Sequence, residues 1–197
     1  MKHVMDTLKI NEEIARKFMA VEKTLDSACS PCELFEILLQ QLGEVFNIPY
    51  VWLTFVSRAG EKEMAARLSL TDTIKEQVGI LDEAYFAEIF PQPAIPVLAN
   101  ENVSRFYKLF PKSRKYFLKS IAVVPLTVHE RLIGSLNLGD ALRERYSAKM
   151  DTSLLQQLAG KISEHLGKMV GQEDELPADS DPALRRSGED PGVSGLE

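Results

Sequence analysis

The chain has 197 residues, of which 45 % are apolar and 26 % charged, enough to bury one good core but too few for a comfortable second domain. The formal charge of −6 lies in residues 171–197, which hold eight acidic and two basic side chains, so residues 1–170 are neutral. No apolar run approaches the roughly 18 residues of a membrane span, and the N-terminus lacks the apolar core of a signal peptide. We therefore expect a cytoplasmic protein without a membrane segment, in which the cysteines are reduced.

The first predicted element is a helix within residues 1–30. Apolar residues follow one another in steps of four and three along it, at Ile14, Phe18, Val21 and Leu25. A helix presents such a stripe along one side, which suits a partner helix or the back of a sheet. We interpret these four residues as a dimerisation seam between two copies of the chain.

The short stretch CSPCE at residues 29–33 has two interpretations. Ser30 with Glu33 three residues later is the pattern of a capped helix start, which predicts a second helix. Cys29 and Cys32 also have the spacing of a redox pair, and a helix N-terminus lowers the pKa of a thiol. We favour the helix start, because thioredoxin-type pairs follow a strand and this pair follows a helix.

The next segments predict an antiparallel hairpin. Residues 50–56 are aromatic and β-branched, as in a strand. Beyond a turn, residues 64–70 alternate between apolar and polar side chains, as in a strand with one wet face. Further short elements are expected as helices at 72–79 and 82–90 and a strand at 95–99.

A second hairpin is predicted at residues 120–139, with its turn at 129–131. Pro125 cannot donate a hydrogen bond to a neighbouring strand, so it marks a bulge or a sheet edge. Ser147 is expected to cap the last helix. Tight turns between consecutive strands favour an antiparallel sheet in an α+β fold.

The hairpin at 120–139 resembles the closing hairpin of the GAF domain family, in which an apolar run, Pro-Leu, a turn, Ile-Gly and an apolar strand follow a small residue. These positions are Ser120, Val123, Val124, Pro125, Leu126, Ile133, Gly134, Leu136 and Leu138. The resemblance extends more loosely over residues 31–170, and residues 139–147 resemble a bacterial branch of GAF-like proteins without an established ligand. It implies a central antiparallel sheet with the N- and C-terminal helices on one face. Short helices and loops of residues 71–119 would cover a small-molecule site on the other face.

The resemblance has two further implications. GAF domains are commonly dimeric through their terminal helices, which agrees with the stripe in the first helix. The members that bind cyclic nucleotides carry Asn-Lys, Phe and Asp-Glu in this closing region. Here Asn137 precedes Leu138, Tyr146 replaces the phenylalanine, and Asp151 precedes Thr152, which argues against a cyclic nucleotide.

Residues 101–119 combine six basic residues and one acidic residue with five interleaved aromatic residues. Bases beside aromatic faces suit a small anionic or planar ligand, and they also suit nucleic acid. A solvated charged surface above packed phenylalanines is the third interpretation. The candidate ligand-binding residues are Arg105, Tyr107, Lys108, Arg114, Tyr116 and Lys119.

Motifs of the common enzyme classes are missing from the sequence: it has no Gly-rich phosphate loop, no Gly-x-Ser-x-Gly and no His-Glu-x-x-His. A zinc site needs about four ligands, whereas the chain offers one cysteine pair and three scattered histidines. We predict neither catalytic nor metal-binding residues, and the cofactor is unknown.

The tail at 171–197 is predicted to be disordered, because its few apolar residues cannot offset the entropy cost of ordering. The whole pattern predicts a non-enzymatic sensory or regulatory module, a homodimer that binds a small molecule or a protein partner and acts through another protein. Two alternatives stay open. One is a thiol redox switch or reductase using Cys29 and Cys32, and the other is a nucleic-acid accessory protein that docks through residues 105–119.

Overall fold

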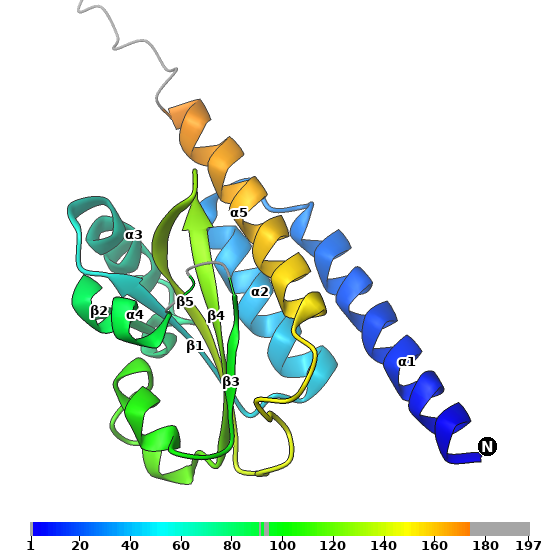
Figure 1. Cartoon of the computed structure of the whole chain (residues 1–197). Coiled ribbons are helices and arrows are strands. Elements are labelled where there is room, and N and C mark those ends of the chain that lie inside the picture. Colours follow the sequence, from blue (N-terminus) through cyan, green and yellow to red (C-terminus); the bar gives the residue numbers. More distant parts are fainter. Residues whose placement is uncertain (1, 91, 93–94, 174–197) are drawn as a thin grey trace, which may run out of the picture.

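Helices cover both faces of one five-stranded sheet (Figure 1). The computed structural model describes residues 2–90, 92 and 95–173, so most of the predicted disordered tail, from residue 174 on, lies outside the described residues. The elements in chain order are α1 (Lys2–Leu25), α2 (Pro31–Phe46), β1 (Tyr50–Val56), α3 (Ala59–Ser69), η1 (Lys75–Gln77), β2 (Val78–Leu81), α4 (Glu83–Ile89), β3 (Val97–Ala99), η2 (Val103–Leu109), η3 (Lys115–Phe117), β4 (Ser120–Val128), β5 (Arg131–Asp140) and α5 (Ser153–Glu173).

The sheet has the strand order β2-β1-β5-β4-β3. Strands β1, β5, β4 and β3 pair antiparallel, while the edge strand β2 runs parallel to β1, with Leu53 opposite Val78. The parallel pair needs a crossover connection, and α3 provides it. The α+β class is confirmed, and so are the terminal helices on one face and the short helices on the other. The expectation of a fully antiparallel sheet is wrong at this one edge, where β2 is parallel to β1.

The predicted strand at 64–70 is wrong, because this segment forms most of α3. Its buried residues are Glu61, Ala65 and Leu68, which lie four and three apart as on one face of a helix. Leu70, which completed the apparent alternation, is 85 % exposed. The segment is rich in Ala, Glu, Met, Leu and Arg, which favour helix over strand.

Two of the smaller elements agree with the sequence and two elements differ. The helix expected at 82–90 and the strand expected at 95–99 form α4 and β3. Residues 72–79 form only the short η1 before β2 begins. The last helix starts at Ser153, whose backbone N–H donates to Asp151 Oδ1 at 3.1 Å, and not at Ser147.

The closing hairpin has the predicted position. His129 and Glu130 form its two-residue turn with φ values of 48° and 65°, the left-handed conformation that two-residue hairpins favour. Pro125 lies in β4 next to a register shift after Leu126, and the pairing of β4 with β3 ends at Val123. A missing donor is tolerated there because no strand pairs with that side of β4 among the described residues.

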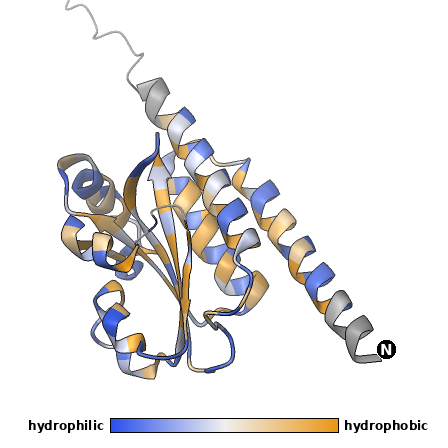
Figure 2. Ribbon diagram, in the orientation of Figure 1, coloured by the Kyte–Doolittle hydropathy of each residue, from blue (hydrophilic) through white to orange (hydrophobic). Residues whose placement is uncertain are grey.

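On one face of the sheet, α1, α2 and α5 form a layer above the larger part of the core. Along these helices apolar stretches alternate with polar ones (Figure 2), and the apolar side chains meet at the sheet. The predicted start of α2 is confirmed. Ser30 Oγ accepts a hydrogen bond from the Glu33 N–H at 3.2 Å, and Glu33 Oε2 accepts one from the Cys29 N–H at 2.8 Å.

The predicted dimerisation seam needs a correction. Phe18, Val21 and Leu25 are buried in the chain's own core, where the Phe18 ring lies 4.7 Å from that of Phe46 in α2. They are therefore not available to a second copy. Ile14, in the N-terminal half of α1, is 36 % exposed.

An ion-pair cluster holds α1 to α5. Asp26 lies 2.9 Å from Lys161 Nζ and 3.0 Å from His165 Nε2. The hydrogen bond from Lys161 lowers the pKa of the Asp26 carboxyl, and the contact with His165 adds to this effect. These contacts are at the surface, so they contribute little stability.

Candidate functional site

The segment from η2 to η3 covers the other face of the sheet. Four of its apolar side chains, Phe106, Leu109, Phe110 and Leu118, are buried against the sheet and α4. The charged side chains between them point outward and are mostly exposed. The alternation of basic and aromatic residues therefore reflects a segment with one buried, apolar side and one exposed, charged side. We call this segment, from η2 to Leu118, the lid.

A buried polar network fastens this lid to the centre of the sheet. Asn137 Nδ2 donates to Thr54 Oγ1 at 2.9 Å and to the Leu109 carbonyl at 3.3 Å. Thr54 Oγ1 donates to the same carbonyl at 3.1 Å, and Ser135 Oγ donates to Asn137 Oδ1 at 2.7 Å. Buried polar groups need partners of this kind, so the network holds η2 in one position over β1 and β5.

Two neighbouring cavities of about 640 Å³ and 170 Å³ lie between the lid and the β1–β2 side of the sheet. They share the lining residues Trp52, Glu76, Val78 and Pro111. We call them together the edge cleft. The larger cavity is bounded by the start of β1, by η1 and by the loop between η2 and η3, and its volume is in the range of roughly 300–1,000 Å³ that is usual for small-molecule sites.

One wall of the edge cleft is aromatic. The rings of Tyr50 and Trp52 are nearly parallel, with centroids 5.7 Å apart and 17° between their planes. Residues two apart on a strand lie on one face, which places both rings on the lid side. Trp52 is held by an edge contact with Phe110 and by a hydrogen bond from Nε1 to the Glu76 carbonyl at 3.2 Å, so the wall is rigid.

The rim of the cleft carries basic groups. Arg114 and Lys75 line the larger cavity, and Lys108 lines the smaller one. Lys75 Nζ lies 2.9 Å from Asp72, and Lys108 lies 4.8 Å above the Tyr85 ring. Burial raises the pKa of the Tyr85 hydroxyl, which keeps that group neutral.

Comparison with known families agrees with this geometry. The sequence matches the family model of the GAF domain over residues 30–166, well over half of the chain. The chain belongs to the GAF domain family. The matched range begins at the cap of α2 and ends within α5. No curated protein matches the chain significantly.

The GAF fold brings together only part of the predicted ligand-binding set. Arg114 and Lys108 line the edge cleft, whereas Arg105, Tyr107, Tyr116 and Lys119 are not among its lining residues. The Arg105 guanidinium lies over the Phe106 ring, and the rings of Tyr107 and Tyr116 meet edge to face at 6.1 Å. These four residues belong to the outer surface of the lid.

Sequence reasoning missed the sheet side of the cleft. Tyr50 and Trp52 were assigned only to a strand, and Gln77, whose Nε2 donates to the Val51 carbonyl at 2.9 Å, was assigned to a helix. The available signal was the pair of aromatic residues two apart at the start of an apolar strand. Nothing in the sequence indicated that Arg114 lines the same cavity as these two residues.

The cysteines lie at the start of α2, away from the edge cleft. Both are free thiols, Cys29 exposed and Cys32 half-buried. Within residues 2–90, 92 and 95–173, no three His, Cys, Asp or Glu side chains form a group that could hold a metal ion. In the same part of the chain, no helix combines the length and the apolar character that crossing a membrane requires.

Proposed function

We propose that this GAF domain is a non-enzymatic sensory or regulatory module that binds a small anionic molecule with a planar ring in the edge cleft. The observation that carries the proposal is the stacked pair of Tyr50 and Trp52 in a cavity that Lys75 and Arg114 also line. An aromatic wall offers a flat surface to a ring, and a guanidinium offers paired donors to a carboxylate or phosphate. Arg114 is the residue that we assign to the anion.

The position of η1 supports a route by which ligand binding in the edge cleft could affect the helical layer of α1, α2 and α5. Glu76 and Gln77 line the edge cleft, while the neighbouring Ile74 is 4 % exposed and packs in the helical layer. Gln77 also lines a groove along α2, together with Ile74 and Gly43. A ligand that moves η1 therefore moves a group that contacts α2, and α2 packs against α1 and α5.

In this proposal, two copies of the chain form a homodimer through the exposed part of α1, and the effect of the ligand passes to the partner copy there. Ile10 is 58 % exposed and Ile14 36 % exposed, one helical turn apart on the same side. This apolar pair continues the stripe whose later members are buried in the core. A second copy that covers it would connect the helical layers of two GAF domains.

Fluorescence of the single tryptophan tests the ligand site, because Trp52 lines the edge cleft. Indole-free probes are used: benzoate, 4-hydroxybenzoate and adenosine 5′-monophosphate. We expect at least one of them to change the Trp52 emission with saturation. Arg114→Ala should weaken that probe about tenfold, equivalent to about 1.4 kcal/mol.

The matched control is Lys112→Ala, which removes an exposed base of the same loop outside the cleft lining. It should leave the affinity within about twofold. Emission that none of the probes changes, or equal losses in the two variants, would refute the assignment of the edge cleft as the anion site.

A further inference from the structure

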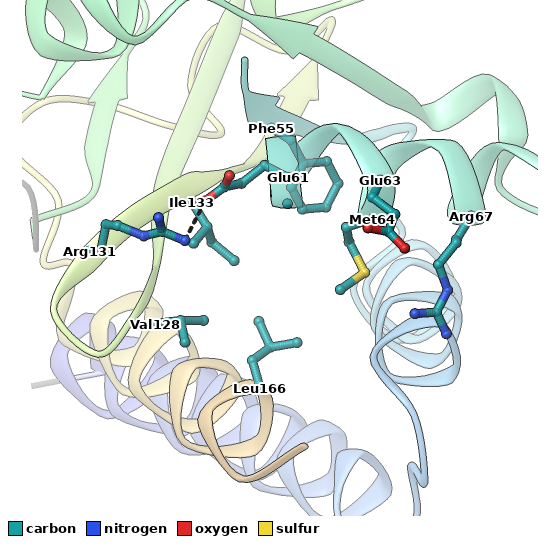
Figure 3. A pocket seen from close by; sticks show the side chains of 10 residues that line it. Phe55, Glu61, Glu63, Met64, Arg67, Val128, Arg131, Ile133 and Leu166 are labelled. Atoms are coloured by element: carbon teal, nitrogen blue, oxygen red, sulfur yellow. Dashed lines mark ion pairs between the residues drawn. The ribbon is translucent and has the colours of Figure 1, made fainter. Parts of the chain in front are cut away.

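A separate cavity of about 250 Å³ lies on the helical face of the sheet. It is bordered by α3, the end of the β4–β5 hairpin and α5, and it shares no lining residue with the edge cleft. Figure 3 shows its apolar walls, with the Met64 side chain directed toward the middle. The apolar lining residues are Phe55, Met64, Val128, Ile133 and Leu166.

A buried carboxylate forms one wall of this cavity. Glu61 in α3 is 5 % exposed, and its Oε1 accepts no hydrogen bond from the described residues. Arg131 Nη2 lies 2.8 Å away (Figure 3), but its N–H is not in hydrogen-bond geometry. The ion pair compensates the charge of Glu61, and Oε1 has no donor in strict hydrogen-bond geometry among the described residues.

A second arginine, Arg58, also pairs with this carboxylate. Arg58 Nη1 lies 3.6 Å from Glu61 Oε1 and donates to the Leu132 carbonyl at 2.8 Å. Its Nε and Nη2 donate to the Glu83 carboxylate. Arg131 itself is 61 % exposed, so water competes for its guanidinium. A carboxylate oxygen can accept more than one hydrogen bond, so Oε1 of Glu61 can also accept one from a molecule in the cavity.

We propose that this cavity binds a small uncharged ring compound that carries one O–H or N–H donor, of the class of phenol and indole. Its volume is below that of drug-sized sites, and an apolar cavity of about 150 Å³ is known to hold benzene. The donor of the ring compound bonds to Glu61 Oε1, while the ring contacts the apolar walls. The charged lining residues balance, Glu61 and Glu63 against Arg67 and Arg131, which favours an uncharged ligand.

Because the cavity borders α5, a ligand bound there would contact the helical layer. It contacts α3, the hairpin and Leu166 of α5 at the same time. The hairpin already lies close to α5, because a Cβ at Gly167 would be 3.6 Å from His129 Nε2. A bound ring would fill the gap between these elements and hold the C-terminal half of α5 to the sheet.

Methyl NMR of protein labelled at methionine tests the site. The chain has six methionines, and Met64→Leu assigns the resonance of Met64. We expect phenol and indole to shift the Met64 methyl signal and to leave that of Met19, a residue 66 % exposed on α1, unchanged. Phenol should bind at least fivefold more tightly than toluene, which has the same shape and no donor.

Three variants test the space in the cavity, the acceptor and the independence of the two sites. Met64→Trp fills the cavity and should abolish phenol binding, whereas the matched Met19→Trp should keep it. Glu61→Met keeps the side-chain length and removes the acceptor, so phenol and toluene should bind equally. Arg114→Ala should leave phenol binding unchanged, which distinguishes this site from the edge cleft.

Two results would overturn the proposal. One is an unshifted Met64 methyl signal at millimolar phenol and indole. The other is equal affinity of the parent protein for phenol and toluene, which would show that Glu61 accepts nothing from the ligand. If Met64→Trp fails to fold, the comparison of Glu61→Met with the parent decides the question.

Discussion

Replacing Asn137 with alanine tests the attachment of the lid to the sheet. The side chain is fully buried and takes part in three hydrogen bonds, to Thr54 Oγ1, the Leu109 carbonyl and Ser135 Oγ. Alanine removes all three. Thr54 Oγ1 and the Leu109 carbonyl still bond to each other at 3.1 Å, but the buried Ser135 hydroxyl loses its acceptor.

The expected loss follows from these contacts. An orphaned buried group costs about 1–3 kcal/mol, and each further lost hydrogen bond costs about 1 kcal/mol. Because the 3.3 Å bond is long, we expect Asn137→Ala to lower the free energy of unfolding by about 2–4 kcal/mol. Ser135→Ala, which removes one bond of the network, should cost about half as much.

Urea unfolding followed by Trp52 fluorescence measures this difference. Trp52 is 8 % exposed in the fold and reports the same region. Asn11→Ala, on the exposed side of α1, is the control and should change stability by less than about 0.5 kcal/mol. If Asn137→Ala is as stable as the control, the network does not hold the lid, and the argument for a preformed edge cleft fails.

Two further predictions concern the helical layer and the segment before α5. The Tyr146 hydroxyl is buried and has no hydrogen-bond partner among the described residues, although Arg145 lies nearby, and burial raises its pKa to about 12. The parent should therefore be fully stable below about pH 10, the ordinary tyrosine pKa, and lose stability as the pH rises toward 12. Tyr146→Phe should be at least as stable as the parent at pH 8. In urea unfolding, its free energy of unfolding should fall less between pH 8 and pH 11 than that of the parent. An equal fall in both proteins would show that Tyr146 does not cause the alkaline loss. In α1, Val21→Glu buries an unpaired charge and should cost at least about 3 kcal/mol, whereas Ile14→Glu should cost less than about 0.5 kcal/mol and convert a dimer into a monomer in sedimentation. A monomeric parent would contradict the proposed dimer.

Local features of the structure could be predicted from the sequence wherever the deciding contacts lie close along the chain. The cap of α2 depends on bonds between Cys29, Ser30 and Glu33, and such side chain–backbone bonds form from neighbouring residues alone. The closing hairpin is local in the same sense, because its two strands follow each other along the chain and are joined by a turn of two residues. The closing hairpin carried the resemblance to the GAF family.

Other features were decided by contacts between distant residues. The segment 64–70 has an alternation that fits a strand and a spacing that fits a helix. Packing of Ala65 and Leu68 in the core selects the helix. The seam of α1 is a similar case, because a stripe of apolar residues does not show whether α2 and α5 or a second copy will cover it.

The sequence by itself determined the class of the fold, the two faces of the sheet and the basic, aromatic lid. Only the tertiary structure decided that Arg114 lines the same cavity as Tyr50 and Trp52, that Asn137 reaches Thr54, and that Glu61 lines a cavity. Asn137 and Thr54 are 83 positions apart, and no local pattern encodes such a pair. The physical reason is that a site is made where separate elements meet, and their meeting depends on the burial of the whole core.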